Sequence, residues 1–465
     1  MFRKALIYLV AGLAGTALTP SLKAQSPGSL ADTSVYRIYG EQFADLLKVR
    51  GLEEDAIATL LDVYRTNNIN SDKGLATLFG RLYPANRGIA MLFYFFQHDT
   101  LRRVFLIPGT VIEKKLIPVT KDELLQLSID LNHTLGLYAS ADNRMPVKRG
   151  LVVTPPPPSK GITYRGVIEK ATALLLPAAF NSSYKHLLII PAMNIGTIPF
   201  QLLSPYPDGS LLVDHCSITV SPGIIDLLGL RTKTLKTLTH WNPSDILSRD
   251  FDTNQPDSFV FKLVSPLFIS NPAYPSNTDY IFPDLPGAKK EIDTAITHVS
   301  HYKLLEGRDA IKDTVLKYMG QSDLVYFATH GMANAENPKK SFLVLSGKDP
   351  FLTVEDIMLH RDQFPQFPEM VILSACQTGL GKSMEAGVAG LARSFMLCGS
   401  NHVIMSLWNV DDEATSFLMN RFLLHLEEPS NFVPAEPLRK AMLETRKKYP
   451  NPTQWASFSS FGIDY

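Results

Sequence analysis

The chain contains the run Asp323-Leu-Val-Tyr-Phe-Ala-Thr-His330-Gly331, in which apolar residues lead to a histidine and then to a glycine. A second run, Glu369-Met-Val-Ile-Leu-Ser-Ala-Cys376-Gln-Thr-Gly379, leads in the same way to a cysteine. Short, β-prone runs of this kind are typical of buried parallel strands. Open α/β sheets place their chemistry at the edge where such strands end. The two runs therefore predict that His330 and Cys376 meet at one edge of an α/β sheet.

This pairing of residue types indicates nucleophilic catalysis. A thiol beside an imidazole can pass its proton over and become a thiolate, the form that attacks carbonyl carbons. We therefore predict a dyad with His330 as the base and Cys376 as the nucleophile. The backbone N–H groups of Gly331 and Cys376 are the candidates for an oxyanion hole, because glycine lets the main chain approach a substrate closely. The mechanism requires no metal and no cofactor, and the sequence assigns no third residue that orients the histidine.

Several motifs resemble those of one family when they are taken together and in order. They are Ala328-Thr-His-Gly331, Leu373-Ser-Ala-Cys-Gln-Thr-Gly379, Gly387-Val-Ala-Gly-Leu-Ala-Arg-Ser-Phe395, Ser406-Leu-Trp-Asn-Val-Asp-Asp412 and Trp455-Ala-Ser-Phe458. This set resembles the CHAT-domain family of caspase-like cysteine peptidases, which is related to separase, caspases and gingipains. Caspases likewise place a histidine about 50 residues before the cysteine. Weaker likenesses, at residues 186–191, 198–200 and 285–291, extend the match from about Gly88 to Tyr465.

The resemblance implies an α/β fold with a caspase-like, parallel-type sheet and helices on both faces. An inactive caspase-like α/β half and a short N-terminal helical segment would precede it. The expected boundaries are 1–24 for a signal peptide, 25–87 for the helical segment, 88–258 for the pseudo-peptidase half with its linker, and 259–465 for the catalytic half. Independently, strands expected at 259–269, 324–328, 371–375 and 402–407 alternate with helical stretches, which favours a parallel sheet. Upstream, the pattern predicts a β-hairpin within 90–107 and helices at 121–138 and 162–176.

A competing motif overlaps the cysteine. Residues 376–383 match a phosphate-binding loop, G-x-x-x-x-G-K-S, with Cys376 in place of the first glycine. That glycine normally provides a turn of the phosphate cradle, and the neighbouring runs end in His330 and Trp408 rather than in a magnesium-binding aspartate. We therefore favour a loop beside the nucleophile over nucleotide hydrolysis.

A carboxylate pair follows the next apolar run, in Trp408-Asn-Val-Asp-Asp412. The resemblance to separase, which reads a basic residue before the scissile bond with a similar tryptophan-aspartate segment, makes Asp412, together with Asp411, a candidate for substrate binding. The alternative is that these carboxylates stabilise the N-terminus of a helix expected at 415–426. The residues leave both roles open.

The overall charge is balanced, with 45 basic and 45 acidic residues, so nothing in it favours nucleic acid or an anionic membrane as a partner. The expected partners are a protein or peptide substrate and an activating protein. Three cysteines make no disulfide framework, and Cys216 and Cys398 are expected to be small core residues.

The N-terminus has the layout of a secretory signal peptide, in which Arg3 and Lys4 precede an uncharged stretch over residues 5–20. Cleavage is expected after Ala24. The alternative, a membrane anchor, is disfavoured because the stretch is shorter than the roughly 20 residues that span a bilayer. We therefore expect an exported protein, periplasmic or extracellular, without stable membrane insertion; an uncleaved chain would be cytoplasmic.

The sequence thus favours a cysteine endopeptidase that hydrolyses peptide bonds of protein substrates, with cleavage after basic residues as a further expectation. The alternative is a non-catalytic peptidase-fold module that binds a peptide or a partner protein.

Overall fold

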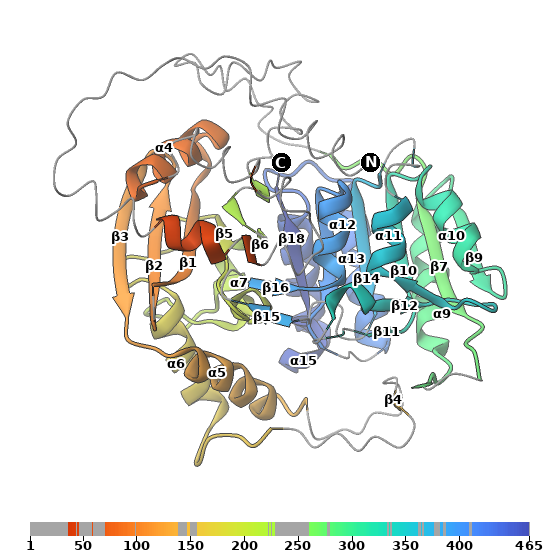
Figure 1. The fold of residues 1–465 in the computed structure, drawn as a ribbon, viewed down its shortest axis with the longest axis horizontal. Helices are drawn as coiled ribbons and strands as arrows, with labels where there is room; N and C mark the ends of the chain where they lie inside the picture. Colours follow the sequence, from red (N-terminus) through yellow and green to blue (C-terminus); the bar gives the residue numbers. More distant parts are fainter. Residues whose placement is uncertain are drawn as a thin grey trace.

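One large sheet runs through most of the described chain (Figure 1). The structure, a computed structural model, describes residues 36–42, 44–45, 58, 70–97, 99–137, 147–148, 156–221, 223–224, 226–227, 260–276, 280–332, 334, 337–360, 364, 367–375, 382–384, 387–408 and 412–464. Its 11-stranded sheet has the order β3-β2-β1-β5-β6-β18-β17-β14-β10-β7-β9. Most neighbouring strands are parallel, as expected. The sequence-based prediction of an α/β fold with a parallel-type sheet is therefore confirmed.

The N-terminal part of the described chain, residues 70–227, supplies the strands at one end of the sheet. Its elements are α4 (Asp72–Leu82), β1 (Ile89–Gln97), β2 (Thr100–Ile107), β3 (Thr110–Ile117), α5 (Lys121–Thr134), β4 (Val147–Lys148), α6 (Tyr164–Leu175), β5 (His186–Ile190), α7 (Leu212–His215) and β6 (Ser217–Val220). Strands β1 and β2 form the predicted antiparallel hairpin. Helices α5 and α6 confirm the two predicted helices, although α5 ends at Thr134, just before a turn in which Gly136 has a φ of 74°.

The C-terminal part, residues 260–464, supplies the strands at the other end. The elements in its first half are β7 (Leu267–Pro272), β8 (Tyr280–Ile281), α9 (Pro286–Ala295), β9 (Lys303–Gly307), α10 (Lys312–Met319), β10 (Leu324–Ala328), β11 (Gly331–Met332), β12 (Phe342–Val344), β13 (Phe351–Thr353) and α11 (Val354–His360). Those in its second half are β14 (Met370–Ser374), β15 (Lys382–Met384), β16 (Gly387–Ala389), α12 (Leu391–Cys398), β17 (His402–Ser406), α13 (Asp412–Leu426), α14 (Ala435–Lys448), α15 (Pro452–Trp455) and β18 (Phe458–Gly462).

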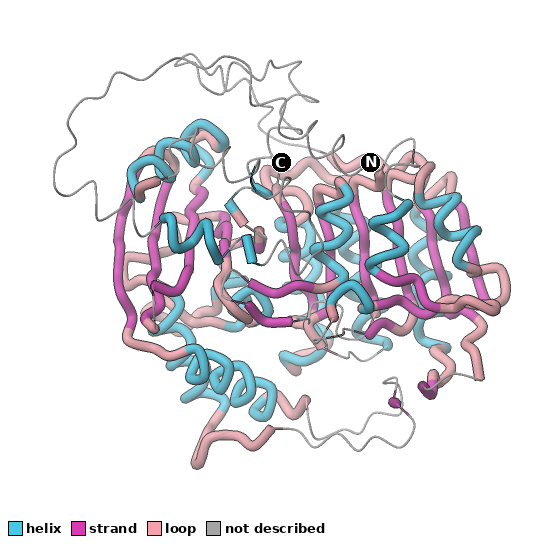
Figure 2. Tube along the Cα trace, in the orientation of Figure 1, coloured by secondary structure: helices cyan, strands magenta, loops and turns pink. Residues whose placement is uncertain are grey.

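Helices cover both faces of the sheet in the C-terminal part, and strand alternation shows which helix lies on which face (Figures 1 and 2). Successive residues of a strand point to opposite faces. On β10, Tyr326 meets Glu291 of α9, whereas the Phe327 ring lies 6.0 Å from the Phe395 ring of α12. Helix α13 packs against α9 and α14, and α11 packs against α12. Every residue of β10 is buried, because both of its faces are covered.

Strand β18 joins the two parts of the sheet. It pairs antiparallel with β17, from His402 opposite Gly462 to Ser406 opposite Phe458. Its other edge pairs parallel with β6, where Ser460 lies opposite Thr219. The last strand of the C-terminal part therefore has a partner on both sides, and the hydrophobic core is continuous across the junction.

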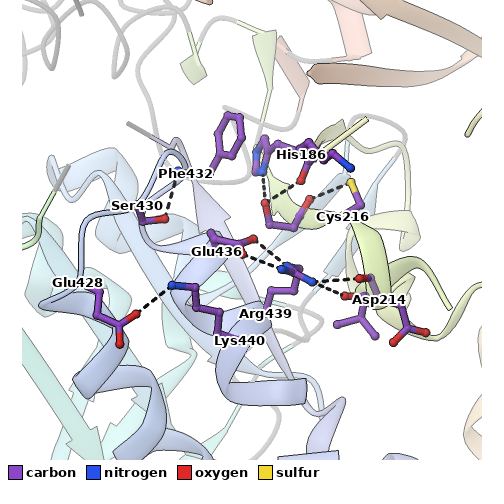
Figure 3. Close-up of polar contacts among 12 residues, drawn as sticks. His186, Asp214, Cys216, Glu428, Ser430, Phe432, Glu436, Arg439 and Lys440 are labelled. Atoms are coloured by element: carbon purple, nitrogen blue, oxygen red, sulfur yellow. Dashed lines mark hydrogen bonds and ion pairs between the residues drawn. The ribbon is translucent and has the colours of Figure 1, made fainter. Parts of the chain in front are cut away.

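Side chains of α14 strengthen this junction (Figure 3). The guanidinium of Arg439 donates to the backbone carbonyls of Val213 and Asp214, at 3.0 and 3.2 Å, and holds the Glu436 carboxylate through two bonds of 2.7 Å. The last carbonyls of a helix have no partner within that helix. Arg439 therefore satisfies the end of α7, and Arg446 adds an ion pair with the Asp214 carboxylate.

One sequence-based expectation needs correction, and two others lie outside the described residues. The strand expected at 259–269 is wrong in its start, because residues 260–266 form no strand and β7 begins at Leu267. In that stretch the N–H groups of Val264 and Ser265 donate to the Asp323 carboxylate instead of to a strand. The signal peptide at 1–24 and the boundary near residue 258 lie outside the described residues.

Arg439→Ala should lower the free energy of unfolding by about 2 kcal/mol, because it leaves two carbonyls and the Glu436 carboxylate without a charged donor. Lys440→Ala, on the same helix, removes only the half-exposed pair with Glu428 and should change it by about 0.5 kcal/mol or less. Urea titration of both variants measures the difference, and equal stability would contradict a role for Arg439 at the junction.

Candidate active site

His330 lies in the link between β10 and β11 and is completely buried. The backbone on both sides is held by the neighbouring strand β12. The carbonyl of His330 accepts from the Val344 N–H at 2.9 Å, and the Thr329 hydroxyl donates to the Val344 carbonyl at 2.6 Å. The histidine therefore leaves the end of β10 on a fixed backbone, as the sequence predicted for a residue at a strand end.

A backbone carbonyl determines the tautomer of His330. Its Nε2 lies 2.7 Å from the Pro283 carbonyl oxygen, just before α9. A carbonyl oxygen only accepts, so Nε2 carries the hydrogen in the neutral ring and Nδ1 keeps its lone pair. Nδ1 is buried, and no group among the described residues forms a hydrogen bond with it. The sequence assigned no group that orients the histidine; the Pro283 carbonyl takes that role.

Aromatic rings surround the imidazole and favour its neutral form. The Tyr274 ring lies 4.7 Å from that of His330, and the Phe282 ring lies 5.8 Å away. Burial lowers the pKa of His330 below its ordinary value, while the Pro283 carbonyl and the Asp284 charge oppose this change. The ring is therefore a neutral base at neutral pH, the form that a general base requires.

Cys376 lies outside the described residues, but the strand that precedes it is well defined. Ser374, the last residue of β14, pairs with Ala328, the last residue of β10. The carbonyl of Ala375 accepts a hydrogen bond from the Ser406 hydroxyl of β17 at 2.5 Å. Ala375, the last described residue before Cys376, therefore lies at the same edge of the sheet at which His330 follows β10.

The other predicted site residues lie near this edge or outside the described chain. Gly331 opens β11 and is buried directly after His330. Asp411 lies outside the described residues, and Asp412 is the first residue of α13. The helix expected at 415–426 thus begins three residues earlier, and Asp412 and Glu413 occupy its first turn. That placement is consistent with the helix-stabilising role and leaves the substrate-binding role untested.

Asp412 also contacts a second helix. A β-carbon at position 287 would lie 1.9 Å from Cγ of Asp412 and 2.1 Å from its Oδ2, so only glycine leaves room for this carboxylate. Gly287 is in the first turn of α9, where the helix dipole favours a negative charge. It is four residues after Pro283, whose carbonyl accepts from His330. Asp412 therefore lies at the end of α9 that faces the histidine.

A buried carboxyl group, which the sequence did not single out, lies beneath this edge of the sheet. Glu291 of α9 accepts a hydrogen bond from the Tyr326 hydroxyl of β10, and the Ser374 hydroxyl of β14 also bonds it. Burial, with a smaller contribution from the nearby Asp412 carboxylate, raises the pKa of Glu291 to about 7 against the opposing effect of the two hydrogen bonds. Its position on the apolar face of α9, beside Ile292 and Ala295, was a signal that the sequence contained. Asp412, Glu291 and Ser374 thus connect three elements of the site.

The structure gives no support to the phosphate-binding loop. Lys382 and Ser383 lie in β15, which forms a two-stranded hairpin with β16, and the next helix, α12, begins at Leu391. A phosphate-binding loop would place this lysine and serine at the start of a helix.

Among the described residues, no group of three histidine, cysteine or carboxylate side chains could hold a metal ion. Cys216 and Cys398 are buried in the core, as expected, and form no disulfide among the described residues. No helix of the described chain is long and apolar enough to cross a membrane.

These features define a caspase-like peptidase-fold module. The model of the CHAT domain matches residues 167–463, and the chain belongs to the CHAT domain family.

Similar proteins include tetratricopeptide repeat protein 28 of Homo sapiens, 22% identical over 320 residues, and its Mus musculus counterpart, 21% identical over 317 residues. Each match covers 60% of this chain but only 12% of the relative. A similar solved structure is that of Saccharomyces cerevisiae separase in complex with securin, with a TM-score of 0.53 at 12% identity. The match covers 98% of this chain and 35% of the separase chain. This likeness shows the fold.

The pH dependence of the unfolding free energy should show whether the pKa of Glu291 is raised in the folded protein. Its pKa in the folded protein is above that of an unfolded glutamate, so the folded state binds more protons and loses stability as the pH rises from about 4.5 to 7. Relative to Glu291→Gln, the wild type should lose about 3 kcal/mol over this window. Denaturation curves at pH 5 and pH 8 measure the effect. Asp412→Asn should move the window to lower pH, and a pH profile shared by the wild type and Glu291→Gln would contradict the assignment.

Proposed function

We propose that the protein is a cysteine endopeptidase that hydrolyses peptide bonds of protein substrates through His330 and Cys376. The observation that carries the proposal is the state of His330. Its Nε2 donates to the Pro283 carbonyl, so Nδ1 is a buried, unprotonated nitrogen at the edge of the sheet to which β14 leads. A general base must keep one nitrogen for its substrate proton, and Nδ1 of His330 meets this requirement at the edge of the sheet where β10 and β14 end.

The proposed reaction has two stages. Nδ1 of His330 accepts the thiol proton of Cys376, and the thiolate attacks the carbonyl carbon of the scissile bond. When the tetrahedral intermediate collapses, the C–N bond breaks, the imidazolium protonates the leaving amine, and an acyl-enzyme remains. Water, deprotonated by His330, then adds to the thioester, and the carboxylic acid product leaves as the thiol is restored. Neither stage needs a metal or a cofactor.

The oxyanion that forms in both stages needs fixed donors. We assign this role to the backbone N–H groups of Gly331 and Cys376, because Gly331 follows His330 directly and begins a strand paired with β12. Paired strands hold their backbone rigidly, and preorganised donors of this kind commonly contribute a factor of 10² to 10³ in kcat.

We further propose that Asp412 favours substrates with lysine or arginine before the scissile bond. Its carboxylate lies against Gly287 at the end of α9 that faces His330, and Glu291 adds a second carboxyl group near it. A basic side chain could form a charge-assisted contact with Asp412, whereas an acidic one would be repelled.

We also propose that the protein is exported, with cleavage of its N-terminal segment after Ala24.

The similarity to separase supports a role for a protein partner. The yeast structure is a complex of separase with securin. We therefore propose that a protein partner controls this peptidase, with the identity of that partner left to experiment.

Cys376→Ala should abolish peptide cleavage, and His330→Gln should reduce kcat/KM by about 10² to 10⁴, because each variant removes one half of the proton transfer. Hydrolysis of a quenched fluorescent peptide library measures the activity, and thermal melting shows whether each variant is folded. A folded Cys376→Ala protein that cleaves as fast as the wild type would refute the mechanism. A wild type that binds peptides without cleaving them would favour the non-catalytic module.

Asp412→Asn should lower kcat/KM for substrates with a basic residue before the scissile bond by about tenfold or more, with little change for neutral ones. Glu413→Gln is the matched control, because Glu413 lies in the same turn of α13 with an exposed side chain. If Asp412 only stabilises helix termini, its replacement should cost about 1 kcal/mol of stability and leave the substrate preference unchanged. Library profiles and melting curves of both variants decide between these roles.

A further inference from the structure

Asn271, at the end of β7, holds the segment that orients His330. Its Nδ2 donates to the Asp284 carboxylate at 3.0 Å, and its Oδ1 accepts from the Leu285 N–H at 3.1 Å. The Asn271 side chain is thus bonded to the side chain of Asp284 and to the backbone of Leu285. These two bonds therefore hold the segment just before α9 against the end of β7.

This segment has no capping side chain of its own. Leu285 is the N-cap residue of α9, and no side chain at that position satisfies the first N–H groups of the helix. The Asn271 amide oxygen accepts instead from the N–H of Leu285 itself, the donor that the N3 carboxylate of a capping box would otherwise bind. The same short segment, 282–285, supplies the Pro283 carbonyl and the Phe282 ring that contact His330.

The backbone of Asn271 has an uncommon conformation at an irregular point of its strand. Its φ is 37°, in the left-handed region that residues other than glycine seldom adopt and that asparagine tolerates better than alanine does. The pairing of β7 with β9 shifts its register between Ser270 and Pro272, so Asn271 forms an irregularity in the strand. Bulges of this kind re-aim a side chain, and strained residues persist where the surrounding structure over-determines them, commonly at functional sites. Here the irregularity directs the amide toward Asp284 and Leu285.

We propose that Asn271 is a positioning residue of the peptidase, which acts through Asp284 and Leu285 to keep the Pro283 carbonyl on Nε2 of His330. This inference rests on the proposed function, because the benefit of the fixed tautomer is a free Nδ1 for the Cys376 proton. Without Asn271, the carbonyl is no longer held at 2.7 Å, and the imidazole can rotate or carry its hydrogen on Nδ1. The fraction of molecules with a competent base then falls.

The test uses two variants of the full chain, Asn271→Gly and Asn271→Ala. Both remove the amide, but glycine adopts a positive φ without strain, whereas alanine keeps the strain. We expect both to lower kcat by about tenfold or more with KM nearly unchanged, since misplacement of a catalytic group acts on the chemical step. Asn271→Ala should also melt at a lower temperature than Asn271→Gly. Ser71→Gly, which removes the capping side chain of α4 in the N-terminal part, is the control and should keep the wild-type kcat.

A readout independent of cleavage separates this inference from the proposed function. Ring ¹⁵N NMR spectra of protein labelled at histidine, with the His330 signals identified by their loss in His330→Gln, report the tautomer directly. We expect the Nε2–H form in the wild type and a mixture in Asn271→Gly. That result without any cleavage by the wild type would support the positioning role and refute the peptidase. Wild-type kcat together with an unchanged tautomer in Asn271→Gly would overturn the inference.

Discussion

The parallel register between β10 and β14 is the constraint on which the site depends. Ala328 lies opposite Ser374 at the last step of both strands, so the chain leaves the two strands at the same level of the sheet. A shift by one residue would exchange the two faces of a strand, and the fully buried side chains of β10 would then point to the wrong helices. Tyr326 would no longer meet Glu291 on α9, nor Phe327 meet Phe395 on α12. The hydrophobic core therefore specifies the register, and the register brings His330 to the edge at which Cys376 follows β14.

How much of this could be predicted from sequence depends on how local the cause is. The bounds of β10, β14 and β17 differ from the predicted ones by no more than one residue, because each is a short apolar run between polar ends. The start of β7 was wrong because Val264 and Ser265 bond the carboxylate of Asp323, which is distant in sequence. A pattern of hydrophobicity along the chain contains no information about such a contact.

The partners of His330 show the same limit more clearly. Its position at a strand end was predictable, but the hydrogen bond from Nε2 goes to the backbone carbonyl of Pro283, and a backbone group leaves no signature in a sequence. Asn271 reads as an ordinary turn residue before Pro272, since asparagine and proline are common in turns. Only the folded chain shows that its amide bonds Asp284 and Leu285. Glu291 differs, because a carboxylate on the apolar face of a helix is visible as an exception in the sequence.

The polar groups around the site lower the stability of the fold while they organise it. Glu291 is buried with its pKa raised to about 7, and ionisation places a second negative charge near Asp412. Nδ1 of His330 is buried without a hydrogen bond among the described residues, which costs free energy that a fully paired core would not lose. Strain at Asn271 adds to these costs. Three unfavourable features near one sheet edge are expected where function, rather than stability, selects the residues.

The junction at β18 restricts how this sheet can meet another chain. Both edges of β18 are occupied, by β17 and β6, so a second copy cannot extend the sheet at the end of the C-terminal part. In the described part of the chain, the sheet ends instead at β3 and β9. Both strands carry charged residues, Lys114 and Lys115 on β3 and Lys303 and Glu306 on β9. Charged edge strands oppose pairing with other strands. A protein partner of the kind proposed above would therefore be more readily accommodated at the carboxyl ends of β10 and β14 than on an edge of the sheet.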